Sequence, residues 1–358
     1  MSSVSLDESV IVRRDGRVGR IVLNRPEVLN ALTHPMVRRF ADTLDAWERD
    51  ERVRLVLLTG TGERGLCSGG DIRAVYQDAT QGDPAATREF WRDEYRLNAR
   101  IASYPKPYVA VMDGVVMGGG IGVSAHGSVR IVTERTIAAM PETAIGLVPD
   151  AGGTYLLSRP PGELGTHLAL TGDSVGAGDA LLCGLADHFV PSAALDALVA
   201  ELAEQELDQV LARHVVPAPP AELAGHQEWI DECYAAETVE DVLDRLVNSS
   251  HPAAAKAAVE IRAKCPTTVK VTFAALRRAR EFSGLEAVLD QEYRVSCRAL
   301  ATPDLVEGIR AQVIDKDRSP RWNPSTLQAV SDESVSRFFV PLGDEELGLA
   351  TTACHEHV

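Results

Sequence analysis

The sequence has few aromatic residues, an excess of acidic over basic residues, and no long apolar run. Phe, Trp and Tyr make up 5% of its 358 residues, and 36 Lys and Arg stand against 52 Asp and Glu, for a formal net charge of -16. This acidic balance argues against generic binding to nucleic acid or to an anionic membrane surface. No apolar run approaches the length of a membrane span, so no membrane partner is expected.

Paired cysteines and metal-ligand patterns are also missing. The six cysteines contain no Cys-x-x-Cys pair, so we expect reduced thiols that serve mainly in packing. No cluster of Cys and His has the spacing of a metal site, and no metal is expected. The N-terminus, Met1-Ser-Ser-Val-Ser-Leu-Asp-Glu, is polar and acidic, unlike a signal or transit peptide, which predicts a cytoplasmic location.

Strand-like runs alternate with helical segments in the first 190 residues. The runs at 10–12 and 20–23 flank Asp15-Gly16 and predict a hairpin. A helix capped by Thr33 is expected over 35–50, with Val37, Phe40, Leu44 and Trp47 on one face. Buried strands are expected at 53–59, 108–112 and 129–133, with a helix opened by the glycines at 118–120. This alternation predicts an α/β fold with a largely buried sheet.

After Val190 the strand-like runs disappear. Amphipathic segments rich in Ala and Leu follow, and they predict helices at 194–213, 237–248, 252–263 and 285–300. Between them, residues 215–220 read Val-Val-Pro-Ala-Pro-Pro, which is typical of a linker. The sequence therefore predicts an α/β core followed by a helical region.

Two glycine-rich loops stand where a strand is expected to pass into a helix. They are Gly65-Leu-Cys-Ser-Gly-Gly-Asp-Ile-Arg73 and Val116-Met-Gly-Gly-Gly-Ile-Gly122. Glycines before a helix allow close backbone approach to a ligand and leave N–H groups pointing outward. Two such loops can aim two N–H groups at one carbonyl oxygen, as in an oxyanion hole. Taken alone, each loop is more often a plain turn at a helix start.

Two carboxylates, Glu142 and Asp150, lie in an otherwise apolar segment rich in glycine and proline. The segment runs Met140-Pro-Glu-Thr-Ala-Ile-Gly-Leu-Val-Pro-Asp-Ala-Gly-Gly-Thr154. Burial of two carboxylates separates their protonation roles, so the pair indicates a site. The alternative is a helix cap at Glu142 and a turn aspartate at Asp150, and the segment alone does not decide between them.

Five short motifs follow one another along the chain: Asn24-Arg-Pro, Cys67-Ser-Gly-Gly-Asp, Gly118-Gly-Gly, Pro141-Glu and Gly152-Gly. This order resembles the enoyl-CoA hydratase (crotonase) superfamily. The resemblance implies an α/β crotonase (ClpP-like) fold of repeated ββα units, with the core at 1–205 and a C-terminal helical region at 206–358. Hydratases of that superfamily carry a glutamate two residues after the third glycine of the second loop. Here that position is Gly122.

Further segments narrow the resemblance. They are Phe90-Trp-Arg-Asp-Glu-Tyr-Arg-Leu-Asn98, Lys106-Pro-Tyr-Val-Ala110, Leu168-Ala-Leu-Thr-Gly172, Asp290-Gln-Glu-Tyr-Arg294, Glu307-Gly-Ile-Arg310 and Ile314-Asp-Lys-Asp-Arg-Ser-Pro-Arg-Trp322. With Met140-Pro-Glu-Thr-Ala-Ile-Gly-Leu147, they look like the 3-hydroxyisobutyryl-CoA hydrolase family, over residues 10 to 340. Generic hydratases share the Glu-Gly pair but not Ile-Asp-Lys-Asp, so the C-terminal motifs are the most specific.

The resemblance implies roles for residues at matching positions. It implies oxyanion N–H groups at Gly70 and Gly119, and catalysis or substrate contact by Glu142 and Asp150. The remaining substrate contacts that it implies are Glu94, Ile72 and, at the nucleotide end of CoA, Arg25.

The activity that the resemblance implies is hydrolysis of a short branched hydroxyacyl-CoA thioester in valine breakdown. CoA is then part of the substrate, and no other cofactor is expected. Two alternatives stay open: a dienoyl-CoA isomerase, whose family carries acidic residues at the same spacing, and a non-catalytic acyl-CoA-binding protein. A homo-oligomer is also open, because many superfamily members form trimers or paired trimers.

Since Gly122 supplies no carboxylate, we predict that crotonyl-CoA is hydrated only negligibly. Loss of the absorbance of the conjugated thioester, followed with pure protein, measures this directly. Robust hydration would contradict the interpretation of the second glycine loop.

Overall fold

The computed structural model describes residues 8–82 and 84–350, which fold into two compact units. Unit 1 contains the segment ending at Gly70, with Arg96–Ala139 and Ser174–Glu222. Unit 2 contains Asp71–Tyr95, Met140–Asp173 and the segment that begins at Leu223. Both units are thus assembled from segments that alternate along the chain. The boundary at 205/206 inferred from sequence stays a prediction.

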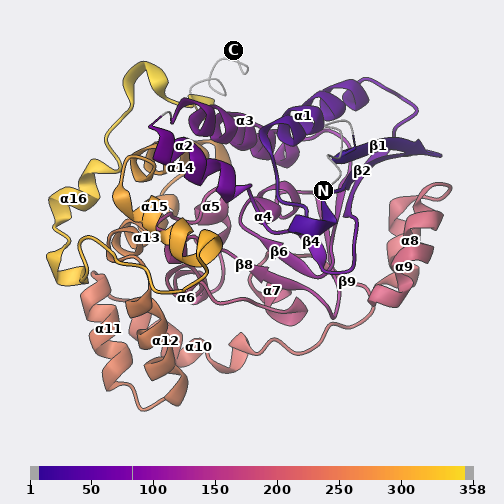
Figure 1. The fold of residues 1–358 in the computed structure, drawn as a ribbon. Coiled ribbons are helices and arrows are strands. Elements are labelled where there is room, and N and C mark those ends of the chain that lie inside the picture. Colours follow the sequence, from indigo (N-terminus) through magenta and orange to yellow (C-terminus); the bar gives the residue numbers. More distant parts are fainter. Residues whose placement is uncertain (1–7, 83, 351–358) are drawn as a thin grey trace. The chain divides into compact units, whose positions relative to one another are not determined.

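Unit 1 begins with the predicted hairpin. Strands β1 (Val10–Asp15) and β2 (Val18–Leu23) pair in antiparallel register, with Asp15 opposite Val18 (Figure 1). Gly16 in the connection has a φ of +59°, in the left-handed region that glycine enters without steric cost. The hairpin is confirmed, and each strand is longer than its apolar run indicated.

Parallel strands extend this hairpin into a large sheet, and further parallel strands form a second, small sheet. The large sheet has the order β1-β2-β3-β5-β7-β9 and the small one β4-β6-β8. Each of β3, β5 and β7 is followed in the chain by a short strand of the small sheet, which produces the ββ repeat. The further strands are β3 (Leu55–Gly60), β4 (Gly65–Cys67), β5 (Tyr108–Met112), β6 (Val115–Met117), β7 (Val129–Val132), β8 (Ile137–Ala139) and β9 (His188–Phe189).

Helices and short helical turns complete unit 1. They are η1 (Pro26–Val28), α1 (His34–Glu48), α4 (Gly119–Ser124), α7 (Ala177–Leu182), η3 (Ser192–Ala194), α8 (Leu195–Leu202) and α9 (Leu207–His214). Helix α1 confirms the expected helix. Thr33 occupies its N-cap position, but the Thr33 side chain forms no capping hydrogen bond. Of the predicted apolar face, Val37, Phe40 and Leu44 are buried.

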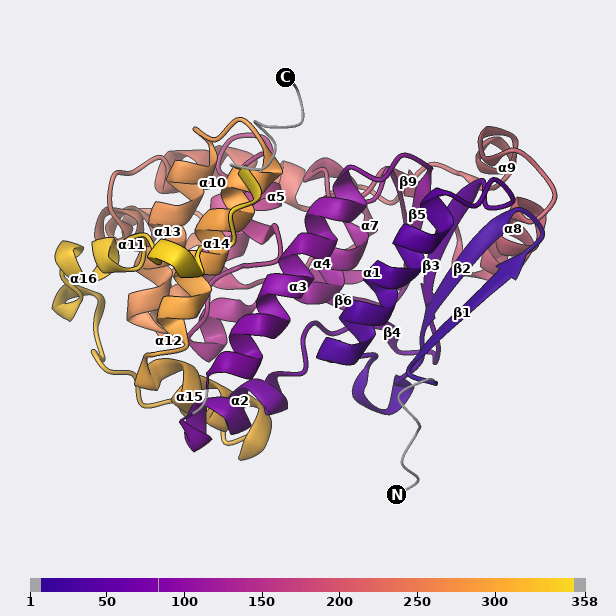
Figure 2. The ribbon, with the colours of Figure 1, turned by 90° about the horizontal axis from the view of Figure 1, so that it is seen from above.

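One hydrophobic cluster of unit 1 lies between the large sheet and helices α8 and α9 (Figure 2). The single helix expected at 194–213 is in fact this pair. The interruption before α9 lets Leu198 and Leu202 of α8 and Val210 of α9 reach the same core, together with Leu57 of β3. The apolar faces of α8 and α9 both pack in this cluster. Tertiary packing therefore divides the segment 194–213 into two helices, although its amphipathic pattern is continuous.

Unit 2 is helical in its described residues. Its elements are α2 (Ile72–Gln81), η2 (Glu142–Ile145), α5 (Gly153–Leu157), α6 (Leu164–Thr171), η4 (Leu223–Gly225), α10 (Gln227–Tyr234), α11 (Val239–Asn248), α12 (Pro252–Ala263), α13 (Pro266–Ala279), α14 (Leu285–Ala299), α15 (Pro303–Ile309), the π-helical turn η5 (Arg310–Ile314), η6 (Leu327–Ala329), α16 (Asp332–Arg337) and η7 (Gly343–Glu345). Helix α3 (Ala85–Ala102) contributes residues to both units.

The helices expected at 237–248, 252–263 and 285–300 are confirmed as α11, α12 and α14. Helix α13 was not expected from the sequence. Its residues Thr268, Val269, Val271 and Thr272 are β-branched and buried, so the first half of its sequence lacks strong helix propensity. Packing in the folded protein, and not intrinsic propensity, therefore makes this segment a helix.

Over the residues that the structure describes, no helix has both the length and the apolarity required to cross a bilayer. The cysteines in this part of the chain are buried and form no disulfide with one another: Cys67, Cys183, Cys233, Cys265 and Cys297.

Candidate active site

In unit 1 the two glycine-rich loops meet at the carboxyl edge of the small parallel sheet. Strand β4 leads to Gly69 and Gly70, and β6 leads to Gly118 and Gly119. A Cβ atom on Gly69, whose φ is +102°, would lie 3.4 Å from the nitrogen of Gly119. A Cβ atom on Gly120 would lie 2.5 Å from the carbonyl oxygen of the first loop's Cys67. The loops thus pack backbone against backbone, which explains the glycines.

Gly70 and Gly119 contribute two unengaged backbone N–H groups. Gly119 is the first residue of α4, so its N–H has no acceptor within the helix. Among the described residues, neither of the two N–H groups is donated to a protein acceptor. The neighbouring Gly118 N–H, in contrast, donates to the carbonyl oxygen of Ala139 at 3.2 Å. Both Gly70 and Gly119 are therefore able to donate to a ligand oxygen.

Gly122 lies buried in α4, one turn beyond Gly118, and its N–H donates to the Gly118 carbonyl oxygen at 3.2 Å. Helix α4 consequently offers no side-chain carboxylate at this position. Cys67, in the first loop, donates its thiol to the carbonyl oxygen of Asn30 at 3.3 Å and is buried. This contact agrees with a packing role for the thiol.

In unit 2, Asp150 is a buried carboxylate held by a tyrosine. The Tyr95 hydroxyl donates to Oδ2 of Asp150 at 2.6 Å, and it lies 3.0 Å from the Ser296 hydroxyl. Burial raises the pKa of Asp150 to about 6, although the hydrogen bond from Tyr95 opposes that rise. Burial and the nearby Asp150 also raise the pKa of the Tyr95 phenol well above its usual value, so Tyr95 stays a proton donor in this pair.

Glu142 and Glu94 are buried near Asp150. Glu142 opens η2 and Glu94 lies on α3, and both side chains are less than 7% exposed. Burial first, and then the charge of Asp150, raises the pKa of each glutamate well above the ordinary value. Oε2 of Glu142 and Oε1 of Glu94 are buried without a hydrogen-bond partner. Such oxygens are costly in a folded protein, which marks this cluster as a functional candidate.

A fourth buried carboxylate, Glu292 of α14, was missed as a site residue. It accepts hydrogen bonds from the turn that follows Asp150. Burial raises its pKa to about 8, and the donated hydrogen bonds oppose this rise. The only signal in the sequence was the Asp290-Gln-Glu-Tyr-Arg294 motif, which reveals nothing of a contact with residues more than 130 positions earlier.

Two predicted residues remain, Arg25 in unit 1 and Ile72 in unit 2. In unit 1, the Arg25 guanidinium donates to the carbonyl oxygen of Ala31 at 2.6 Å, beside the turn η1. In unit 2, Ile72 is the first residue of α2 and is partly exposed. The substrate contacts that the resemblance implies for both residues stay predictions.

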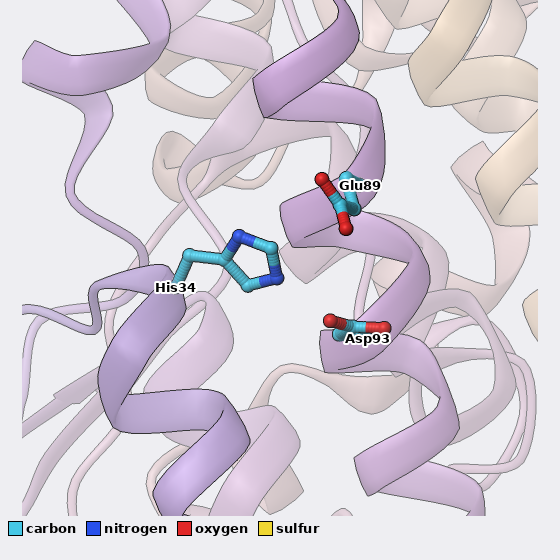
Figure 3. A group of neighbouring side chains, drawn as sticks. All are labelled: His34, Glu89 and Asp93. Carbon is cyan, nitrogen blue, oxygen red and sulfur yellow. The ribbon is translucent and has the colours of Figure 1, made fainter.

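Two carboxylates on α3, the exposed Glu89 and the half-buried Asp93, have the chemistry of cation ligands. Figure 3 shows the side chains of Glu89 and Asp93, one helical turn apart, on the same side of α3. His34, also drawn there, is the first residue of α1 in unit 1. Acidic side chains four residues apart are common on helix surfaces, and we assign no role to this pair.

Comparison with known proteins identifies the relatives of this chain. A family model described as Enoyl-CoA hydratase/isomerase matches residues 18–339. The chain belongs to this family. Its 3-hydroxyisobutyryl-CoA hydrolase-like motifs agree with a relative of that name: it is 42% identical to the mitochondrial 3-hydroxyisobutyryl-CoA hydrolase of Gallus gallus, over 95% of this chain and 91% of that protein.

Two solved structures confirm the fold of this enoyl-CoA hydratase/isomerase family member. One is a carnitinyl-CoA dehydratase from Mycobacterium thermoresistibile, with a TM-score of 0.92 and 50% identity over 95% of this chain and 98% of that chain. The other is an enoyl-CoA hydratase from Rhodobacter sphaeroides, with a TM-score of 0.90 and 43% identity over 95% and 99%. The predicted crotonase fold of ββα units with a C-terminal helical region is therefore confirmed.

The predicted cytoplasmic location is wrong by this comparison, because the Gallus gallus relative is named as a mitochondrial protein. The prediction rested on composition and on the polar residues 1–8, most of which lie outside the described residues. Soluble proteins of different compartments face the same aqueous solvent, so surface composition does not distinguish between them.

Replacing Tyr95 with Phe tests the electrostatics of the carboxylate cluster. The substitution removes the hydroxyl that lowers the pKa of Asp150 and keeps the burial that raises it, so this pKa should rise above about 6. NMR titration of labelled aspartate carboxyl carbons measures the change, with Asp150→Asn to identify the resonance. Tyr104→Phe, which removes a hydroxyl bound to Leu44 in unit 1, is the control. An unchanged or lower pKa of Asp150 in Tyr95→Phe would show that the Tyr95 hydroxyl does not lower this pKa.

Proposed function

We propose that this chain hydrolyses the thioester of 3-hydroxyisobutyryl-CoA, or of a similar short hydroxyacyl-CoA, to the free acid and CoA in valine breakdown. The Gallus gallus relative supports the substrate, since the match covers nearly the whole of both chains. In this proposal CoA is part of the substrate, and no additional cofactor takes part. Assembly into a homo-oligomer stays a prediction.

The observation that carries the proposal is a cluster of buried carboxylates combined with a glycine where hydratases have a glutamate. Glu142 and Asp150 are buried, with raised pKa values, while position 122 has no side chain. Adding water across a double bond in this superfamily uses two carboxylates, one at the position of Gly122 and one at the position of Glu142. Hydrolysis of a thioester needs one group to activate water or to attack, and other groups to orient the reactants.

Glu142 has the properties of the reactive carboxylate. Its raised pKa makes it a stronger base than an exposed glutamate, and its unpartnered Oε2 is ready to accept a proton. As a base, it takes a proton from water while the water oxygen bonds to the thioester carbon. As a nucleophile, it attacks that carbon itself, and water cleaves the resulting anhydride. In both routes the carbon–sulfur bond breaks and the leaving sulfur is protonated to CoA.

The N–H groups of Gly70 and Gly119 are suited to stabilise the developing oxyanion. Fixed N–H donors contribute strongly to acyl transfer because they are oriented before the charge develops. Their freedom from protein acceptors supports this role. Asp150 and Glu94 would orient the water or the hydroxyl group of the acyl chain.

A dehydratase is the second candidate, because the Mycobacterium thermoresistibile protein at 50% identity carries that name. A dehydratase removes a proton and a hydroxyl group from the acyl chain and leaves the thioester intact. Gly122 disfavours this reaction, since only one of the two usual carboxylate positions is occupied. The isomerase and the non-catalytic binding protein also leave the thioester intact.

One assay separates these functions. Pure protein is incubated with 3-hydroxyisobutyryl-CoA, and free thiol is followed with a thiol reagent. Thiol release supports the hydrolase. An ultraviolet change from an enoyl thioester without thiol release supports the dehydratase, and a change with a dienoyl-CoA alone supports the isomerase. Binding without any of these changes supports the non-catalytic protein.

Glu142→Gln should retain acyl-CoA binding and lose most turnover. The neutral amide keeps the size of the side chain but neither accepts the proton nor attacks the thioester. Calorimetric binding of an unreactive thioether analogue and steady-state thiol release measure the two properties. Near-normal turnover would remove Glu142 from the mechanism.

Gly119→Val should lower turnover through loss of an oxyanion donor. A side chain there would crowd the thioester or turn the N–H away, and one lost donor costs about 3 kcal/mol, roughly a hundredfold or more in rate. The loss should fall mainly on kcat, because the charge develops in the transition state. Thermal unfolding must be measured as well, because overpacking destabilises a fold. A folded variant with the parent rate would show that this loop is a plain helix-entry turn.

A further inference from the structure

Glu292 is a buried carboxylate of α14 that the proposed chemistry does not use. Its Oε2 accepts the N–H of Gly152 at 2.6 Å, and its Oε1 accepts the N–H and the hydroxyl of Thr154 at 2.7 and 2.5 Å. The side chain is 1% exposed. All three donors belong to the turn that begins at Asp150, so one side chain fixes the backbone directly after the candidate catalytic carboxylate.

The backbone of this turn requires such an anchor. Ala151 has a φ of +53° and Gly152 a φ of +82°, and a residue with a Cβ atom rarely adopts the left-handed region. Within the turn, the Gly153 N–H donates to the carbonyl oxygen of Asp150 at 2.7 Å. A strained conformation persists when surrounding contacts determine it, and Glu292 supplies three such contacts.

Helix α14 also reaches the Asp150 side chain, through Tyr95. Ser296, one helical turn after Glu292, lies 3.0 Å from the Tyr95 hydroxyl that donates to Asp150. The Tyr293 ring packs edge-on against Tyr95, with 6.2 Å between the ring centroids. The backbone after Asp150 and the hydrogen-bond donor to its carboxylate are thus both held by one helix.

We propose that Glu292 is a positioning residue: it fixes the turn of residues 150–154 and thereby holds the Asp150 carboxylate in the orientation that turnover requires. This inference rests on the proposed function, in which Asp150 orients the water or the acyl hydroxyl group. The three donors to Glu292 all belong to Gly152 and Thr154, in the turn that follows Asp150, so in this inference Glu292 acts through Asp150. An orientation error of about 1 Å at a reacting group can lower a rate by about a hundredfold while most of the substrate's binding contacts remain.

Glu292→Gln tests the role of the carboxylate. Glutamine keeps the side-chain shape but has a single acceptor oxygen, so it cannot accept from both Gly152 and Thr154. We expect kcat for 3-hydroxyisobutyryl-CoA to fall at least about tenfold, with KM within about threefold of the parent value. Glu163→Gln is the matched control, because Glu163 is another buried carboxylate of unit 2 and accepts from Thr166, Arg277 and Arg280. The control should lower Tm and leave kcat near that of the parent.

A second pair of variants keeps the charge unchanged. Thr154→Val removes only the hydroxyl donor to Glu292 and keeps the side-chain volume, whereas Thr154→Ser keeps the donor. We expect a several-fold loss of kcat in the valine variant and near-parental kcat in the serine variant. If Glu292→Gln does not fold, the comparison of Thr154→Val with Thr154→Ser still tests the positioning role of Glu292.

The outcomes separate this inference from the proposed function. Loss of kcat at nearly constant KM in Glu292→Gln, with a Tm loss no larger than in Glu163→Gln, supports the positioning role. If the parent releases thiol and Asp150→Asn does not, but folded Glu292→Gln and Thr154→Val match the parent, the positioning inference alone is overturned. If the parent releases no thiol, the proposed function is wrong, and the positioning inference that rests on it is wrong too. If Asp150→Asn remains active, the role of Asp150 is wrong, and Glu292 has no catalytic group to position.

Discussion

The burial of several carboxylates in unit 2 without cationic partners is the constraint on which the other features of the site depend. Glu94, Glu142, Asp150 and Glu292 are each less than 7% exposed, and within the described residues none of them forms an ion pair. Removing a charged group from water is costly, and proteins usually compensate with a counter-charge. Burial raises the pKa of all four carboxyl groups, and the charge of Asp150 raises the pKa of the three glutamates further.

Hydrogen bonds distinguish the four carboxylates from one another. Glu292 accepts three and Asp150 accepts one from Tyr95, whereas Glu142 and Glu94 each keep a buried oxygen without a partner. The first two carboxyl groups are therefore fixed by protein donors, and the other two each keep an oxygen that is able to accept a hydrogen bond. In the proposed function, one cluster thus combines positioned and reactive carboxyl groups.

The fold and the site differ in how far they could be predicted from the sequence. Runs of apolar residues and their spacing predicted the hairpin, α1, α11, α12 and α14. They failed for α13, whose first half is rich in buried Val and Thr, and the three-residue strands of the small sheet are too short for a pattern. The contact between Glu292 and Thr154 joins residues 138 positions apart. Spacing carries no information about such a pair, so only the folded chain could reveal it.

The reaction class depends as much on Gly122 as on the carboxylates that are present. Glycine there keeps α4 free of an acidic side chain, and the backbone contact between Gly120 and Cys67 fixes this helix start against the first loop. In the proposed function, Glu142 is the reactive carboxylate, Asp150 orients the reactants, and α14 holds the turn that follows Asp150. Since such a buried cluster opposes folding, its presence supports chemistry on a thioester over thioester binding alone.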